Sequence, residues 1–191
     1  MFEFIIAVIV FIIAYFVFRW YFKDPKRKLA RAICILVGQN NSINGLIYLN
    51  ELSDGNTHIY GKIINLPPGK HAFHIHEYGN MIQGCSTVGG HYNPFNKNHG
   101  ARVIADSKGN VQINYNRHVG DLGNIIANKK GEAVINFVDP LVKLTGTTSV
   151  IGRSIVVHAK VDDLGLGETE DSLKTGSAGI RMACGIIGLI Q

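Results

Sequence analysis

Residues 43–69 read INGLIYLNELSDGNTHIYGKIINLPPG. Two apolar runs rich in β-branched side chains, 43–50 and 57–66, lie on either side of the turn-forming residues Ser53-Asp54-Gly55-Asn56. A second turn signal, Pro67-Pro68-Gly69, then ends the second run. The stretch therefore predicts two β-strands joined by a tight turn.

The same alternation of short apolar runs and turn signals continues along the chain from residue 29 onward. Evenly spaced short strands without a long amphipathic helix are typical of sandwiches and barrels, so we predict an all-β domain. Two long irregular stretches, 78–121 and 161–181, are expected to be functional loops because such lengths are otherwise unusual. The eight candidate strands are residues 30–37, 43–50, 57–66, 71–77, 122–127, 132–138, 154–160 and 182–190.

Composition and charge exclude several other classes. Of the 191 residues, 46% are hydrophobic and 17% charged, which is too apolar for a disordered chain. Three cysteines allow at most one disulfide bridge, which excludes a small disulfide-rich scaffold. The net charge is +5, but residues 32–191 carry 13 basic and 12 acidic residues. Because this balance leaves no basic face, we expect no nucleic acid partner.

The N-terminal segment is apolar enough to enter a membrane. Residues 4–18 read FIIAVIVFIIAYFVF, without a charge, and basic residues follow. We predict a hydrophobic transmembrane anchor helix over 1–22, a basic linker over 23–29 and a folded domain over 30–191, placed in the cytosol by the positive-inside bias. A cleaved signal peptide, giving a secreted protein, and a buried helix of a soluble cytosolic protein are the alternatives.

Histidines gather in and around the first long stretch. In His74-Ile75-His76 both rings lie on one face of the predicted strand 71–77, because residues i and i+2 share a face. Imidazole is a preferred ligand of copper and zinc, and zinc also accepts a carboxylate. We therefore predict a metal site from these two histidines and from five further residues, His91, His99, His118, Asp121 and His158.

Several strings, in order from about residue 30 to residue 191, together resemble copper/zinc superoxide dismutase. They are HIHEYG at 74–79, GC at 84–85, GGHYNP at 89–94, HG at 99–100, HVGDLGN at 118–124, GRSIVVH at 152–158, DDLG at 162–165, KTG at 174–176 and AGIRMACG at 178–185. The resemblance implies an eight-stranded Greek-key barrel or sandwich. It also implies dismutation of superoxide to oxygen and hydrogen peroxide, in antioxidant defence.

The resemblance further implies ligands for two metals. One copper ion, alternating between Cu(2+) and Cu(+), and one Zn(2+) ion are expected per subunit. His91 is expected to bind both ions through its two ring nitrogens. The copper ligands would be His74, His76, His91 and His158, and the zinc ligands His91, His99, His118 and Asp121.

Other residues acquire roles only through the same resemblance. Asp162 would accept hydrogen bonds from His74 and His99 and link the two metal sites. Arg181 would lie beside the copper and, with His91, take part in catalysis.

The resemblance also assigns residues outside the immediate metal site. Lys174 and Thr175 would steer superoxide, and Cys85 and Cys184 would form a disulfide. Cys34 is then left as a thiol, which we expect to be buried. The resemblance implies a homodimer whose contact is an apolar barrel face.

One segment departs from the pattern of the family. Residues 101–117, ARVIADSKGNVQINYNR, make the spacing between His99 and His118 longer than usual. The segment contains a turn signal at 106–110 between two β-like runs. We therefore predict a small additional hairpin that projects from the loop.

Overall fold

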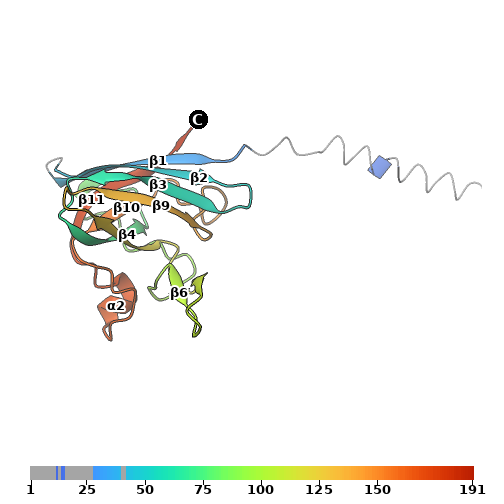
Figure 1. Ribbon diagram of the computed structural model, residues 1–191. Helices are drawn as coiled ribbons and strands as arrows, with labels where there is room; N and C mark the ends of the chain where they lie inside the picture. The colour runs from blue at the N-terminus through green and yellow to red at the C-terminus, as the bar shows by residue number, and fades with distance from the viewer. Residues whose placement is uncertain (1–11, 13, 16–27, 40–41) are drawn as a thin grey trace, which may run out of the picture.

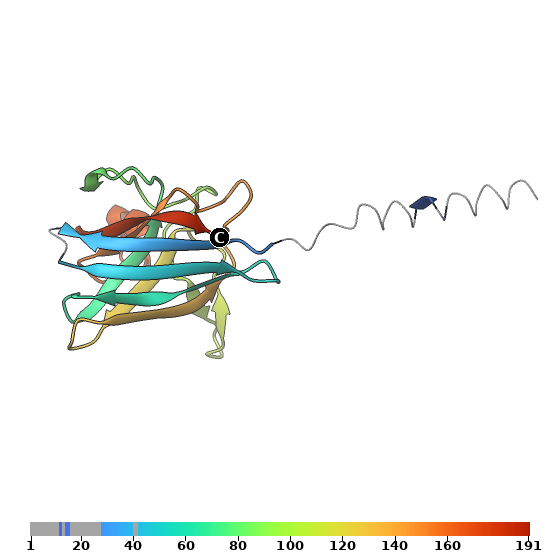
Figure 2. The same ribbon diagram turned by 90° about the horizontal axis from the view of Figure 1, so that it is seen from above.

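The alternating runs of the sequence form a closed barrel of eight antiparallel strands (Figures 1 and 2). The structure, a computed structural model, describes residues 12, 14–15, 28–39 and 42–191. Around the barrel the strands follow the order β1-β11-β10-β4-β8-β9-β3-β2, which confirms the predicted fold class. The strands are β1 (Arg31–Gly38), β2 (Asn44–Glu51), β3 (Thr57–Ile64), β4 (Gly69–His76), β8 (Asp121–Ala127), β9 (Ala133–Asp139), β10 (Ser154–His158) and β11 (Arg181–Ile190).

Several neighbours in the barrel are far apart in the sequence, as a Greek-key path requires. β3 pairs with β9, and β4 pairs with both β8 and β10. The loop 78–121 therefore connects the adjacent strands β4 and β8, and the loop 161–181 connects the adjacent strands β10 and β11. Both loops can return to the barrel wall from which they leave.

Alternation along each strand separates a core face from an outer face. Ile47, Phe73 and Ile155 are fully buried in the core cluster, where each side chain contributes on the order of 1.5–3 kcal/mol. β4 is buried on both faces over its last six residues. Its outer face carries His74 and His76, whose rings lie against side chains of the long loop.

The loops contain short elements of their own. β5 (Ile82–Cys85) precedes the predicted hairpin, which is confirmed as β6 (Val103–Ala105) paired with β7 (Val111–Ile113). The second loop contains the helix α2 (Glu170–Thr175), which the sequence analysis did not predict. Figure 1 shows α2 and the β6 hairpin projecting below the barrel.

A disulfide joins the first long loop to the last strand. Cys85 at the end of β5 is bonded to Cys184 in β11, as the resemblance implied. The two residues are 99 positions apart, and closing a loop of that size stabilises the fold by about 4–5 kcal/mol in the chain-entropy model. Cys34 is buried, as expected, and burial raises the pKa of its thiol to about 12.

The predicted membrane helix over 1–22 lies outside the described residues, apart from Ile12, Ala14 and Tyr15. Most of the predicted linker over 23–29 lies outside them too. Within the described part of the chain, no helix has the length and apolar character needed to cross a bilayer.

Candidate metal centre

Three of the predicted copper ligands lie on two adjacent barrel strands. His74 and His76 are neighbours on the outer face of β4, and His158 is the last residue of β10, which pairs with β4. The long loop returns to this place and brings His91 into a β-bridge with His76. The ligand atoms of these four histidines all lie within 4.8 Å of one another. His76 Nε2 and His158 Nε2 are only 3.1 Å apart.

The predicted zinc ligands form a second group of the same kind. The ligand atoms of His91, His99, His118 and Asp121 also lie within 4.8 Å of one another. Asp121 Oδ1 is 2.9 Å from His91 Nδ1 and 3.0 Å from His118 Nδ1. His99 Nδ1 is equally close to it, at 2.9 Å, but is not aligned for a hydrogen bond. Asp121 Oδ2 accepts the backbone N–H groups of Gly100 and His118.

His91 belongs to both groups. Its Nδ1 faces Asp121, and its Nε2 is buried without a hydrogen-bond partner. Its side chain is 3% exposed. One imidazole thus offers one nitrogen to each group, which is the geometry that a bridging ligand requires.

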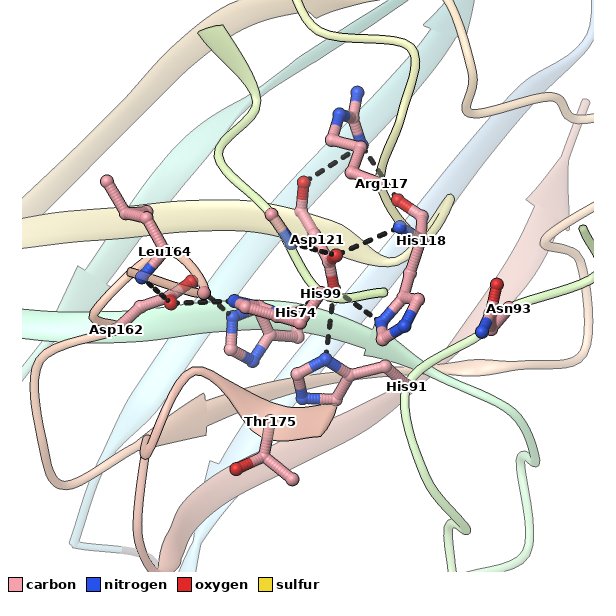
Figure 3. A network of polar contacts seen from close by, with 12 residues as sticks. His74, His91, Asn93, His99, Arg117, His118, Asp121, Asp162, Leu164 and Thr175 are labelled. Atoms are coloured by element: carbon pink, nitrogen blue, oxygen red, sulfur yellow. Dashed lines mark hydrogen bonds and ion pairs between the residues drawn. The ribbon is translucent and has the colours of Figure 1, made fainter. Parts of the chain in front are cut away.

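Asp162 connects the two groups from the other side. Its Oδ2 is 2.9 Å from His74 Nε2, and its Oδ1 is 2.7 Å from His99 Nε2 (Figure 3). The carboxylate is itself held, because Oδ1 also accepts the backbone N–H of Leu164. A carboxylate that fixes one ring nitrogen leaves the other nitrogen of the same ring directed at a metal.

The donor atoms fit copper and zinc. Among the described side chains, His74 Nδ1, His91 Nε2 and His99 Nδ1 are buried ring nitrogens without a hydrogen-bond partner. Leaving a buried polar group unpaired costs about 1–3 kcal/mol. Three unpaired ring nitrogens in one site therefore indicate that the site binds a ligand. A set of four imidazoles suits copper, and three imidazoles with one carboxylate suit zinc.

Burial keeps the copper-side histidines neutral. Burial, with the neighbouring His91, lowers the pKa of His74 to about 3 and the pKa of His76 well below its usual range. Burial likewise lowers the pKa of His158 to about 4. Neutral rings keep a lone pair available, so these residues can bind a cation without first losing a proton.

The zinc side has the opposite electrostatic character. Burial lowers the pKa of His99, but its interactions with Asp121 and Asp162 outweigh burial and raise it to about 9. Burial raises the pKa of Asp121, yet hydrogen bonds from His118 and His91, together with the charge interaction with the nearby His99, hold it well below its usual range. This half of the site therefore contains an ionised carboxylate that attracts a cation.

Arg181 lies next to the copper-side histidines. Its guanidinium donates to the carbonyl oxygens of Cys85 and Gly89, and Gly89 O also accepts from His76 Nδ1. The arginine charge contributes to the lowered pKa values of His76 and His158. The disulfide loop therefore fixes a positive charge beside this group.

Lys174 and Thr175 lie on α2, outside both ligand groups. Lys174 is exposed and paired with Glu170 one helical turn away, with their charged atoms 2.5 Å apart. Thr175 Oγ1 donates to Asp171 Oδ1 at 2.7 Å. Part of the lysine charge is thus offset within the helix.

The sequence analysis missed a buried ion pair behind the predicted zinc ligands. Arg117 is fully buried, and its Nη2 is 2.6 Å from Asp139 Oδ2. Its Nη1 donates to the carbonyl oxygens of His118 and Asp121. The partners come from a loop and from β9, and no motif in a single sequence links them.

Gly176 is a second residue that the analysis missed. It has φ +64° and caps α2, and a Cβ at this position would lie 2.0 Å from Asp162 Oδ1 and 2.5 Å from His99 Nε2. Only glycine fits so close to the carboxylate that links the two groups. A glycine directly after a helix is the usual sequence signal of such a cap.

The two remaining histidines of the chain, His58 and His71, lie outside both groups. His71 is buried in β4, with Nδ1 3.0 Å from the backbone oxygen of His158 and Nε2 2.8 Å from that of Pro67. His58 lies on β3, with Nε2 2.7 Å from Asn136 Oδ1.

An eight-stranded barrel with two buried four-ligand groups that share one histidine defines a class of binuclear copper- and zinc-binding proteins. Residues 43–187 match the family model described as copper/zinc superoxide dismutase. The chain belongs to this family, and copper and zinc are its metals.

Individual relatives cover most of the chain. Superoxide dismutase [Cu-Zn] A of Xenopus laevis is 46% identical over 160 residues, which span 84% of this chain and 98% of the relative. The extracellular superoxide dismutase [Cu-Zn] of Brugia pahangi is 47% identical over 165 residues, 85% of this chain and 77% of the relative. Among solved structures, the clock protein EA4 superposes with a TM-score of 0.77 at 40% identity, covering 87% of this chain and 99% of that chain.

Proposed function

We propose that the chain dismutates superoxide to oxygen and hydrogen peroxide at this centre, in antioxidant defence. The two groups of ligand atoms that share His91 are the observation that carries the proposal. His74, His76, His91 and His158 would hold copper, and His91, His99, His118 and Asp121 would hold zinc. When bound, copper supplies the one-electron couple that takes an electron from one superoxide and gives it to a second.

The residues around the ligands have separate tasks in this reaction. Arg181 orients the anion, because its guanidinium is anchored on the carbonyl groups of Cys85 and Gly89 and stays positively charged. His91 can take up a proton at Nε2 and deliver it to the peroxide product. Asp162 holds His74 and His99 in fixed orientations, so that both halves of the site keep their geometry.

Electrostatic steering is the testable signature of this mechanism, and the family is itself an example of it. We expect the copper- and zinc-loaded full chain to consume superoxide quickly, at a rate that falls as salt rises. Arg181→Ala should lower the low-salt rate about 10-fold or more and flatten the salt dependence. Arg181→Lys keeps the charge without the planar group and should fall in between. A negligible rate for the wild type with copper bound would show a metal-binding module instead.

We further propose that the protein is a homodimer through the β1–β11 face. Ile33, Ile35, Met81 and Ile186 line a shallow apolar groove there, and Ile35 is 62% exposed. A second copy of this face is the occupant that the family resemblance favours. Ile35→Glu should give monomers in sedimentation experiments, whereas Val134→Glu, on the exposed side of β9, should not. A monomeric wild type contradicts this part of the proposal.

For localisation, we propose that residues 1–22 anchor the protein in a membrane, with the enzyme domain in the cytosol. The uncharged run 4–18 and the basic residues after it support this placement. The relatives named extracellular favour the alternative, a cleaved signal peptide and secretion. Retention of the full chain in washed membranes supports the anchor. A shortened chain in the medium, or a full-length chain in the soluble fraction, contradicts it.

A further inference from the structure

The additional hairpin has a base that is built differently from its tip. Toward the tip, Ile104 and Val111 are exposed. At the base, Asn114 N–H donates to the backbone oxygen of Arg102 at 3.0 Å, and the Asn114 side chain donates to Ala101 O at 2.9 Å. The two ends of the insertion are therefore closed on each other.

Arg102 attaches this base to the barrel. Its guanidinium carbon lies 4.4 Å from the centre of the Phe137 ring on β9. Its Nη1 donates to the backbone oxygen of Val138 at 3.3 Å. A guanidinium stacked on an aromatic ring is held by a cation–π interaction, so the hairpin is fixed at its root.

The hairpin base also contacts the residues that hold the zinc ligands. The backbone oxygen of Asn114 accepts Arg117 Nε at 3.1 Å. Arg117 in turn donates to the carbonyl oxygens of His118 and Asp121 and pairs with Asp139. On the other end, Ala101 follows Gly100, whose N–H donates to Asp121 Oδ2. Both ends of the insertion thus reach the zinc group within a few residues.

We propose that the hairpin base, through Arg102, is a positioning element for the zinc group. Arg102 acts on no ligand directly; it fixes the loop from which Arg117 holds His118 and Asp121. The proposal rests on the zinc ligand set of the proposed function. In the hydrogen bonds of the described residues, the side chains of the copper ligands on β4 and β10 have no partner in the hairpin base, so we expect the effect to fall mainly on zinc.

The test compares zinc and copper affinity in the same metal-loaded full chain, by competition with a chromophoric chelator. Arg102→Ala should weaken zinc binding about 10-fold, as losses of residues behind metal ligands do, and change copper affinity less than about 2-fold. Arg102→Lys should give an intermediate loss, because it keeps the charge but not the stacked plane. Lys108→Ala, at the exposed tip of the same hairpin, is the matched control and should have no effect.

Each other outcome overturns a defined statement. Unchanged zinc affinity in Arg102→Ala, or an equal loss of both metals, contradicts the positioning role. If Arg102→Ala does not fold, Arg102→Lys and Asn114→Ala must weaken zinc selectively, and wild-type zinc affinity in both contradicts the proposal. His118→Ala in the otherwise native chain separates the two hypotheses. Retention of zinc by that variant shows that the ligand assignment, rather than the role of the hairpin, is wrong.

Discussion

The two halves of the proposed metal centre, the predicted copper ligands and the predicted zinc ligands, are held by different parts of the molecule. On the copper side, His74, His76 and His158 lie on the adjacent strands β4 and β10, whose register is set by backbone hydrogen bonds. On the zinc side, His99 and His118 lie in the long loop. The barrel fold alone therefore prepares most of the copper group, whereas the zinc group depends on what orders the loop.

The loop is ordered by side chains that carry charge in the interior. Arg117 and Asp139 form a fully buried ion pair, and Asp121 and Asp162 are buried carboxylates bonded to histidines. Such groups are costly to desolvate and depend strongly on their partners. We expect the zinc half to be the more sensitive to single substitutions away from the ligands.

The largest effects should come from a matched pair of ligand substitutions. His158→Ala should lower copper affinity and superoxide turnover at least about 100-fold, because ligands matter more than the residues behind them. His118→Ala should remove zinc but keep copper, with a smaller loss of turnover. Metal content and superoxide consumption, measured on the same samples, check both. Equal loss of copper in the two variants would contradict the division of the site.

Breaking the buried ion pair should be the next largest effect. Arg117→Ala leaves the Asp139 carboxylate buried without its partner and should reduce the free energy of unfolding by about 3–5 kcal/mol. Lys62→Ala breaks the exposed pair with Glu132 and should cost less than about 1 kcal/mol. Chemical denaturation of both proteins tests this contrast. Similar losses in the two variants would show that the buried pair does not hold the loop.

A pair of glycine substitutions isolates the contact behind Asp162. Gly176→Ala and Gly146→Ala both place a side chain at positive φ, which costs about 1–2 kcal/mol. Only at Gly176 would the new Cβ also meet the Asp162 carboxylate, since nothing lies within 4 Å at Gly146. We expect weaker metal binding in Gly176→Ala alone, measured by chelator competition. Identical metal affinities in the two variants would refute the steric argument.

In the metal-free protein the two halves should respond to pH in opposite directions. His158, with a pKa of about 4, stays neutral while the unfolded chain protonates near pH 6.5, so stability falls as the pH drops below about 6.5. His99, with a pKa of about 9, adds stability below about pH 6.5 that is lost as the pH rises through 9. His158→Gln should reduce the loss of stability at acid pH. His99→Gln should reduce the loss of stability at alkaline pH. Denaturation curves across this range test both, and unchanged profiles in the variants would argue against these assignments.

Periodicity predicted the barrel well, because strand alternation is a local property of the sequence. All eight runs became strands, with ends shifted by at most two residues, as at β3, which ends at Ile64. The six residues of α2 are too short for a helical period to show. The Arg117–Asp139 pair was not predicted for a different reason. It joins a residue of the long loop to a strand residue 22 positions later in the sequence, and no local pattern links the two.

The candidate site was predicted in two different ways. The face shared by His74 and His76 follows from strand geometry alone. The assignment of His99, His118 and Asp121 to a separate zinc site came only from the resemblance, because no local pattern determines how a long loop folds. The same limit explains why the contact between Gly176 and Asp162 was not foreseen.

Hydrogen exchange of the metal-free protein, with and without added zinc, tests the division of the site most directly. The backbone N–H groups of Gly100 and His118 both donate to Asp121 Oδ2 and should exchange quickly until zinc is added. Amides of β10, which pairs with both β4 and β11 in the barrel, such as that of Ile155, should be protected in both states. Equal gains of protection in the strands and in the loop would show that the barrel does not prepare the copper group in advance.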